Sequence, residues 1–238
     1  RRQRQMCIRD SFKEAQKYLK FSDYKAVQLS KNTTAFSYTS KKYDYSKIIG
    51  PTDYLYRTGV EFTPQQLYML KGLGKSEKDN YYKFTNKDFS LSKYKIQDQP
   101  KDGWNFPTTN IYPIITGPNI EAFNYNSNNE YCILPYTKDN TNTPIPSDIM
   151  LKENKDILIY LANHKELIDK QSEKSKQMHR GKEFYALSKI GPYTFADYIV
   201  AARDNSKFCA SVIKKETTPW NEEKQVTVSY THLRAHET

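Results

Sequence analysis

The sequence predicts an α+β fold, with mostly antiparallel sheets of short strands and one long helix. Short apolar runs rich in aromatic and β-branched residues, each bounded by turn-forming residues, predict the strands. A helical stripe of apolar residues over about 154–176 predicts the helix. Aromatic residues make up 14% of the chain. This content argues against disorder, because disordered chains are poor in rings and cannot bury a core.

The chain of 238 residues carries a formal charge of +10. Its two ends, residues 1–11 and 228–238, resemble translated sequencing-adapter DNA, so we interpret both as artefacts and leave them out of the fold prediction. The first end carries +3 and the second carries zero, which leaves +7 on residues 12–227. On this interpretation the chain is an interior piece of a longer protein.

The composition is compatible with nucleic-acid binding. Lysine suits contacts to phosphate, and the 20 tyrosines supply rings on which bases stack. An AT-rich genome gives a similar composition to a protein of any function. No run of 18 apolar residues predicts a membrane span. Without the two ends, Cys132 and Cys209 remain, which suggests free thiols in a reducing compartment and gives no metal-ligand spacing.

Residues 12–105 are expected to hold a connector and then a small α+β region. Apolar patterns predict a short helix over 12–19 and a strand over 24–29. The sequence Thr63-Pro64 is a typical helix start, and it predicts a second helix that carries three leucines and ends near Gly74. Further predictions for this part are strands over 81–84 and 89–96 and a turn over 100–103.

Residues 106–227 are expected to form a second region that begins with two strands. These strands are predicted over 111–115 and 130–134. Pro113 argues for an edge position or an irregular strand, because proline cannot donate a ladder hydrogen bond.

A polar loop over 137–146 leads to the predicted long helix. His164 lies on the apolar stripe of that helix, so we predict a packed core histidine and not a ligand.

The most informative stretch of the chain is 181–213. Three apolar runs of strand length lie in it, at 184–187, 198–202 and 208–213. The turn-type cluster Arg203-Asp-Asn-Ser206 separates the last two. These two runs therefore predict a hairpin, with Arg203 and Asn205 carried at its tip.

The tip of this hairpin holds the two side-chain types that read bases through bidentate hydrogen bonds, arginine at guanine and asparagine at adenine. We predict Arg203 and Asn205 as base readers. Lysines near them suit phosphate contacts, and a nearby tyrosine suits packing or stacking; these residues are Lys182, Lys189, Lys207 and Tyr185. The alternative is a polar hairpin turn with a solvated basic rim.

The sequence shows no catalytic constellation. It lacks a Gly-rich phosphate loop and the motifs Cys-x-x-Cys, His-Glu-x-x-His and Gly-x-Ser-x-Gly. Acidic residues are scattered, and no pair is placed as a general acid and base. From the residues alone we predict a basic α+β interaction region with no catalytic residue, cofactor site or metal site of its own.

Residues 111–220 resemble the target-recognition region of adenine-specific DNA methyltransferases of restriction–modification systems, which have a TaqI-like C-terminal specificity domain. The matching segments occur in the order of that family. They are Ile111–Ile120, Cys132–Tyr136, Ile157–Leu161 with Glu166–Asp169, Phe184–Gly191, Val200–Asn205 and Pro219-Trp220.

The resemblance implies that 106–227 is a DNA specificity domain. It also implies that 12–105 holds the linker from an upstream catalytic domain and the N-terminal part of the recognition region. It also implies that the S-adenosylmethionine site and the catalytic Pro-Pro-Tyr motif of the parent enzyme lie before residue 1.

Three functions follow from these observations. The first is sequence-specific recognition of duplex DNA by part of a site-specific adenine-N6 methyltransferase of the prokaryotic or phage cytoplasm, which flips the target base. The second is a protein-interaction or scaffold domain without a DNA role, in which positive charge is spread evenly. The third is a nuclease domain, which needs a metal-binding carboxylate cluster that the sequence does not show.

Overall fold

The computed structural model describes residues 57–89, 96–170, 181–203 and 209–229, and the backbone of 25–28 and 36–39. The chain divides into two compact units, residues 1–56 and 57–238. In the first unit, β1 (Lys25–Gln28) pairs with β2 (Phe36–Thr39) in antiparallel fashion. The strand predicted over 24–29 is therefore confirmed at β1. The helix predicted over 12–19 lies outside the described residues.

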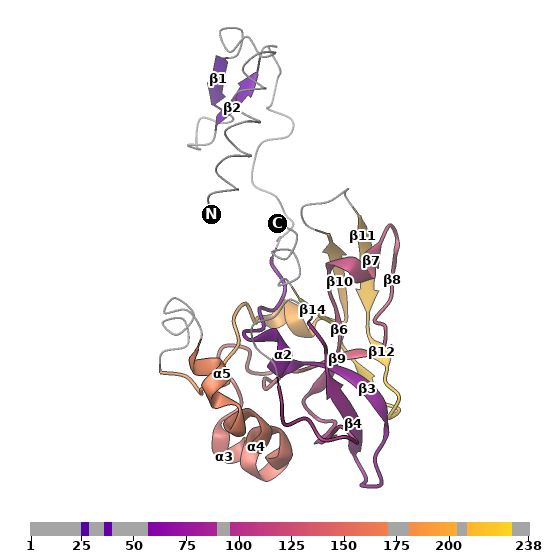
Figure 1. Cartoon of the computed structure of the whole chain (residues 1–238). Helices are drawn as coiled ribbons and strands as arrows, with labels where there is room; N and C mark the ends of the chain where they lie inside the picture. The colour runs from indigo at the N-terminus through magenta and orange to yellow at the C-terminus, as the bar shows by residue number, and fades with distance from the viewer. Residues whose placement is uncertain are drawn as a thin grey trace. The chain divides into compact units, whose positions relative to one another are not determined.

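A six-stranded sheet forms the centre of the second unit, in the order β14-β6-β9-β3-β4-β5 (Figure 1). All of its pairings are antiparallel except that of β14 with β6. The predicted α+β class with mostly antiparallel short strands is confirmed. The strands are β3 (Met69–Lys75), β4 (Tyr81–Asn86), β5 (Trp104–Pro107), β6 (Ile111–Ile115), β9 (Glu130–Ile133) and β14 (Thr227–Val228).

The sheet joins parts of the chain that the sequence assigned to different regions. Strands β3 and β4 precede residue 105, and they pair with β9 and β5 in the same sheet. A boundary at 105 would cut this sheet. Val228 and Ser229, in the end attributed to adapter sequence, also belong to it, since Val228 pairs with Ile115 and the Ser229 N–H donates to the Ile115 carbonyl at 2.9 Å.

The helix predicted from Thr63-Pro64 to Gly74 is wrong after its first turn. Helix α2 covers only Gln65–Tyr68, and β3 begins at Met69. The run Leu67–Leu70 is fully buried at every position, whereas a surface helix buries one stripe. Met69 and Leu70 pair with β9, and Leu70 also pairs with β4, so tertiary contacts override the helical spacing of the leucines from Met69 on.

Strand β6 lies inside the sheet, so the edge position predicted from Pro113 is not observed. β14 pairs only with Ile114 and Ile115, at the end of β6. Pro113 lies just before this pairing and faces Tyr131 of β9. The missing N–H is therefore placed where β14 does not reach. The second predicted strand, over 130–134, is confirmed at β9.

Three short helices lie in this part of the chain, and the last two of them replace the single helix predicted over 154–176. They are α3 (Ser147–Glu153), α4 (Lys155–Asn163) and α5 (Lys165–Asp169). Asn154, with φ −138°, separates the first two, and His164 separates the last two. Asparagine and histidine are weak helix formers, so the apolar stripe, on which His164 itself lies, does not carry one continuous helix through these two positions. Residues 171–176 lie outside the described part.

The predicted apolar stripe is nevertheless the buried face of α4, through Ile157, Tyr160 and Leu161. The Tyr160 ring packs edge-on against Trp104 of β5, with ring centroids 4.8 Å apart. His164 is buried, as predicted: its Nδ1 lies 2.7 Å from the Tyr160 carbonyl oxygen and its Nε2 lies 2.8 Å from the Asp98 carboxylate. These contacts hold the helices against the sheet.

Short hairpins and 3₁₀ turns complete the second unit. The antiparallel pairs are β7 (Ile120–Glu121) with β8 (Asn124–Tyr125), β10 (Tyr198–Ala202) with β11 (Ala210–Lys214), and β12 (Glu216–Thr217) with β13 (Glu223–Lys224). The 3₁₀ turns are η2 (Gly117–Asn119) and η3 (Pro192–Phe195). Among the described residues, none of the helices has the length and apolar character needed to cross a bilayer.

Candidate nucleic-acid interface

The hairpin predicted from 198–202 and 208–213 is confirmed as β10–β11. Its register sets Val200 opposite Val212 and Ile199 opposite Ile213. Because side chains alternate between the two faces of a strand, one face is covered and the other is open. Ala201 and Ile213 are buried in a small second core that also contains Ile115, Ile120 and Val226.

The other face of the hairpin, which we call the outer face, exposes large apolar side chains. Tyr198, Val200 and Val212 are 72%, 75% and 59% exposed. Lys214 continues this face and is also exposed. Figure 1 shows β10 and β11 extending away from the six-stranded sheet beside β7 and β8. The outer face is thus an apolar ribbon with a cationic end.

The start of the hairpin tip is fixed by Arg203, whose backbone N–H donates to the Cys209 carbonyl at 2.9 Å. Arg203 is half-buried. The other two predicted contacts of the tip, Asn205 and Lys207, lie outside the described residues. The joint projection of the Arg203 and Asn205 side chains therefore stays a prediction.

Lys182 and Lys189 line one pocket, and Tyr185 lies in the core behind them. Tyr185 is fully buried and its hydroxyl donates to the Ile145 carbonyl at 2.6 Å. Burial raises the pKa of this hydroxyl above its usual range. Of the two roles predicted for Tyr185, packing is observed; a ring buried in this way cannot stack on a base.

The strand predicted over 184–187 is wrong. The described backbone there is a turn followed by an irregular segment, with one β-bridge between Ser188 and Glu61. The segment bonds to tyrosine side chains in place of a neighbouring strand. The Tyr136 hydroxyl accepts from the Leu187 N–H at 2.9 Å and donates to the Leu187 carbonyl at 3.2 Å.

The lysine pocket has a volume of about 200 Å³ and is formed by two segments, 136–142 and 182–190. The Lys182 Nζ donates to the Asn142 carbonyl at 3.2 Å. The Lys189 Nζ lies 3.5 Å from a carboxylate oxygen of Glu61. The polar side chains that line the pocket are Tyr136, Thr141, Asn142, Lys182, Ser188 and Lys189. No carboxylate is among the residues that line it.

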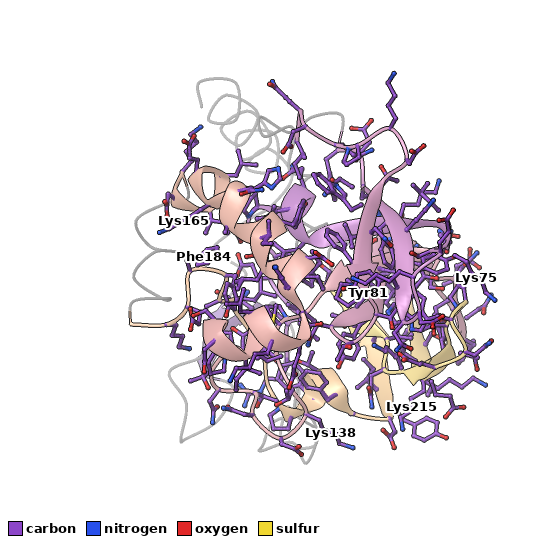
Figure 2. The ribbon with its side chains drawn as sticks, turned by 90° about the horizontal axis from the view of Figure 1, so that it is seen from below. Lys75, Tyr81, Lys138, Lys165, Phe184 and Lys215 are labelled. Carbon is purple, nitrogen blue, oxygen red and sulfur yellow. The ribbon has the colours of Figure 1, made fainter. Side chains whose placement is uncertain are left out.

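Positive charge is not concentrated on the described surface. The described parts of 57–229 contain almost equal numbers of basic and acidic residues. The positive excess therefore lies in the remaining segments, which include Lys93 and Lys95 in 90–95 and three basic residues in 171–180. Figure 2 shows the labelled lysines on different sides: Lys75 and Lys165 lie far apart, and Lys138 and Lys215 lie along a third side.

Near Lys138 and Lys215, a cluster of charges surrounds the base of the hairpin. The Lys215 Nζ lies 3.0 Å from the Asp197 carboxylate. Lys215, with a smaller contribution from Lys138, lowers the pKa of Asp197. Acidic residues therefore offset part of the cationic end of the outer face.

A buried lysine next to the last strands was missed by the sequence analysis. The Lys224 Nζ donates to the carbonyls of Thr108 and Thr109 and lies 4.9 Å from the Tyr112 ring centroid. Burial lowers its pKa. The sequence Glu222-Glu223-Lys224 is typical of a solvated turn, and it contains no signal that this ammonium ties a loop to the core.

The remaining groups of the described part give no catalytic arrangement. Cys132 is a buried free thiol and Cys209 is a half-buried one. Burial raises the pKa of the Cys132 thiol to about 12, so it is not an activated nucleophile. Within the ranges that the structure describes, no three His, Cys, Asp or Glu side chains are grouped to hold a metal ion.

Comparisons with known proteins gave no match for this chain among protein-family models, curated proteins or solved structures.

Proposed function

We propose that this chain recognises a specific duplex-DNA sequence as part of a site-specific adenine-N6 DNA methyltransferase of a restriction–modification system. In this proposal the parent enzyme binds S-adenosylmethionine and flips the adenine, while this region selects the site. The observation that carries the proposal is the hairpin β10–β11, with Arg203 where its tip begins. The major groove of B-DNA admits a two-stranded antiparallel ribbon.

Two further observations support the proposal. Lys182 and Lys189, both predicted from the sequence as phosphate contacts, lie on the same pocket although seven positions separate them. The segments 90–95 and 171–180 each carry a net charge of +2, whereas the described surface is close to neutral, and lysine and arginine suit contacts to the DNA backbone.

Fluorescence anisotropy with labelled duplexes tests the proposal. If about five phosphates are neutralised, log affinity falls against log salt with a slope of about −4 to −5. Arg203→Ala is expected to cost about 1–3 kcal/mol on the preferred sequence and to relax the preference at one base pair. Lys75→Ala, which removes one exposed charge from β3, is the control. Duplex binding that is undetectable or independent of salt would contradict the proposal.

A second function, a protein-interaction domain without a DNA role, is favoured by the outer face of the hairpin. Tyr198, Val200 and Val212 are exposed side by side, and contiguous apolar surface is typical of protein contacts. The even balance of charge on the described surface also suits this function. Val212→Lys separates the two, because an added cation strengthens a DNA contact and weakens an apolar protein contact.

A further inference from the structure

We infer that the pocket between segments 136–142 and 182–190 binds a phosphate group, and that in a DNA complex this group is a backbone phosphate. The second half of this inference rests on the proposed function, and the first half does not. The pocket holds about 200 Å³. This is room for several waters of about 30 Å³ each, and so for one phosphate.

Both walls of the pocket are held rigidly by hydrogen bonds to tyrosine hydroxyls. Tyr136 exchanges two bonds with the Leu187 backbone, and Tyr185 reaches the Ile145 carbonyl. The Tyr193 hydroxyl donates to the Lys189 carbonyl at 2.6 Å. The walls therefore need little ordering when a ligand enters, and a preorganised site loses less conformational entropy on binding.

The loop that forms one wall is fixed by its own side chains. The Asn140 amide Nδ2 donates to the Thr143 hydroxyl at 2.8 Å, and the Asn140 Oδ1 accepts from the Asn142 N–H at 3.2 Å. This arrangement places Thr141 and Asn142 on the pocket. Hydroxyl and amide donors of this kind bind phosphate oxygens beside lysine.

The charge of the pocket favours an anion. An ammonium group has three donors, and the Lys182 Nζ uses one of them on the Asn142 carbonyl. Two acidic side chains close to the pocket already have partners: Glu61 pairs with Lys189, and Glu183 accepts from the Ser147 N–H at 2.9 Å.

Titration with inorganic phosphate, followed by backbone amide shifts of 182–190, tests the pocket itself. Lys182→Ala is expected to weaken phosphate binding about tenfold or more, because a charge-assisted hydrogen bond is lost. Glu61→Gln is expected to strengthen it, because a competing carboxylate is removed. Lys75→Ala is the matched control: Lys75 lies across the molecule from Phe184, which is close to Lys182 in the chain (Figure 2).

The titration overturns the inference if phosphate causes no shifts at 182–190, or if Lys182→Ala leaves the affinity unchanged. Because Lys182 is exposed, its replacement is expected to leave the fold intact, and an unchanged melting temperature checks this. Opposite effects of Lys182→Ala and Glu61→Gln would support a specific anion site.

Duplex binding of the same variants separates the two sources of phosphate. Lys182→Ala is expected to lose one contact to a DNA phosphate, so its plot of log affinity against log salt becomes less steep by about 0.9. Lys75→Ala is expected to leave this slope unchanged. An unchanged slope would overturn the backbone-phosphate half and leave a site for free phosphate. Absence of all duplex binding would overturn the proposed function, while the phosphate titration would still decide the pocket.

Discussion

The six-stranded sheet and the hairpin β10–β11 are built from similar apolar runs, but they bury them to different extents. In β4, Tyr82 and Phe84 point into the core and contact Trp220, whose ring centroid lies 5.2 and 6.0 Å from theirs. In the hairpin, Val200 and Val212 face outward and are mostly exposed. The buried side chains of the sheet therefore provide most of the stability of the unit, and the outer face of the hairpin contributes little to that stability.

This difference separates two kinds of apolar residue that look alike in the sequence. Burial of an apolar side chain stabilises a fold in proportion to the area removed from water. A valine that stays 75% exposed gains little in this way. The outer face is therefore available for a partner at small cost to the fold, and the proposed protein-interaction function uses it.

Replacement of Phe84 by alanine is the strongest test of the comparison. Phe84 is fully buried and its ring contacts Tyr82, Phe106, Tyr131 and Trp220. We expect Phe84→Ala to lower the free energy of unfolding by about 3–5 kcal/mol, because it removes apolar contacts and leaves a cavity. Urea unfolding followed by tryptophan fluorescence measures this change.

Val212→Ala is the control on the hairpin. It removes two methyl groups from an exposed position, and we expect a change of about 0.5 kcal/mol or less. A cost for Val212→Ala that approaches that of Phe84→Ala would show that the outer face is covered within the protein itself. The division between a stabilising sheet and an open hairpin would then be wrong.

A smaller effect is expected at two glycines with similar backbone conformation. Gly103 ends the turn before β5 with φ +80°, and Gly181 has φ +77°. A Cβ atom at Gly103 would lie 2.5 Å from the Phe84 carbonyl oxygen, while one at Gly181 meets nothing within 4 Å. We expect Gly181→Ala to cost about 1 kcal/mol from the backbone conformation alone.

Gly103→Ala is expected to cost at least about 2 kcal/mol, because the clash with the sheet adds to the same backbone strain. Thermal unfolding of the two variants gives the difference directly. Equal costs would mean that the turn moves away from β4 freely, and the sheet would then be less rigid at this edge than its contacts indicate.

The sequence predicted those elements whose signals are local. The turn at 100–103 is present, with the Gly103 N–H bonded to the Pro100 carbonyl at 2.9 Å. The hairpin β10–β11 also followed from two apolar runs and the turn-type residues between them. The class of the fold was predictable because such runs recur along the chain.

The errors arose where distant contacts decide the structure. The leucines after Pro64 have helical spacing, but only Leu67 lies in α2. From Met69 the chain is a strand, because it pairs with β9, more than fifty residues away. The segment 184–187 is apolar enough for a strand, but the Tyr136 hydroxyl takes the backbone groups of Leu187. The residue pattern within each segment gives no information about the distant residues with which that segment pairs.

The candidate site was only partly predictable from the sequence, again because contacts between distant segments form it. The sequence singled out Lys182 and Lys189, but it did not indicate that Thr141 and Asn142 share their pocket, because that pocket joins two segments about forty residues apart. It also placed Tyr185 at the interface, although the ring is buried. Overall charge gave no guide to position, since the described surface is close to neutral.

The smallest perturbation that compares the two regions is thiol labelling. Cys132 lies in β9 within the main core, and Cys209 lies at the base of the hairpin tip. Labelling requires the thiolate, and burial raises the pKa of Cys132 to about 12. In a Cys7→Ser protein at pH 8, we expect Ellman's reagent to modify Cys209 quickly and Cys132 only as fast as the sheet opens.

Addition of Phe84→Ala to this protein sharpens the comparison, because Phe84 and Cys132 belong to the same core. Destabilising the sheet increases the population of the open state, so Cys132 is expected to label faster while Cys209 keeps its rate. If both thiols accelerate together, the hairpin and the sheet open as one unit. If Cys132 reacts as fast as Cys209 before Phe84 is replaced, the main core is not closed around β9.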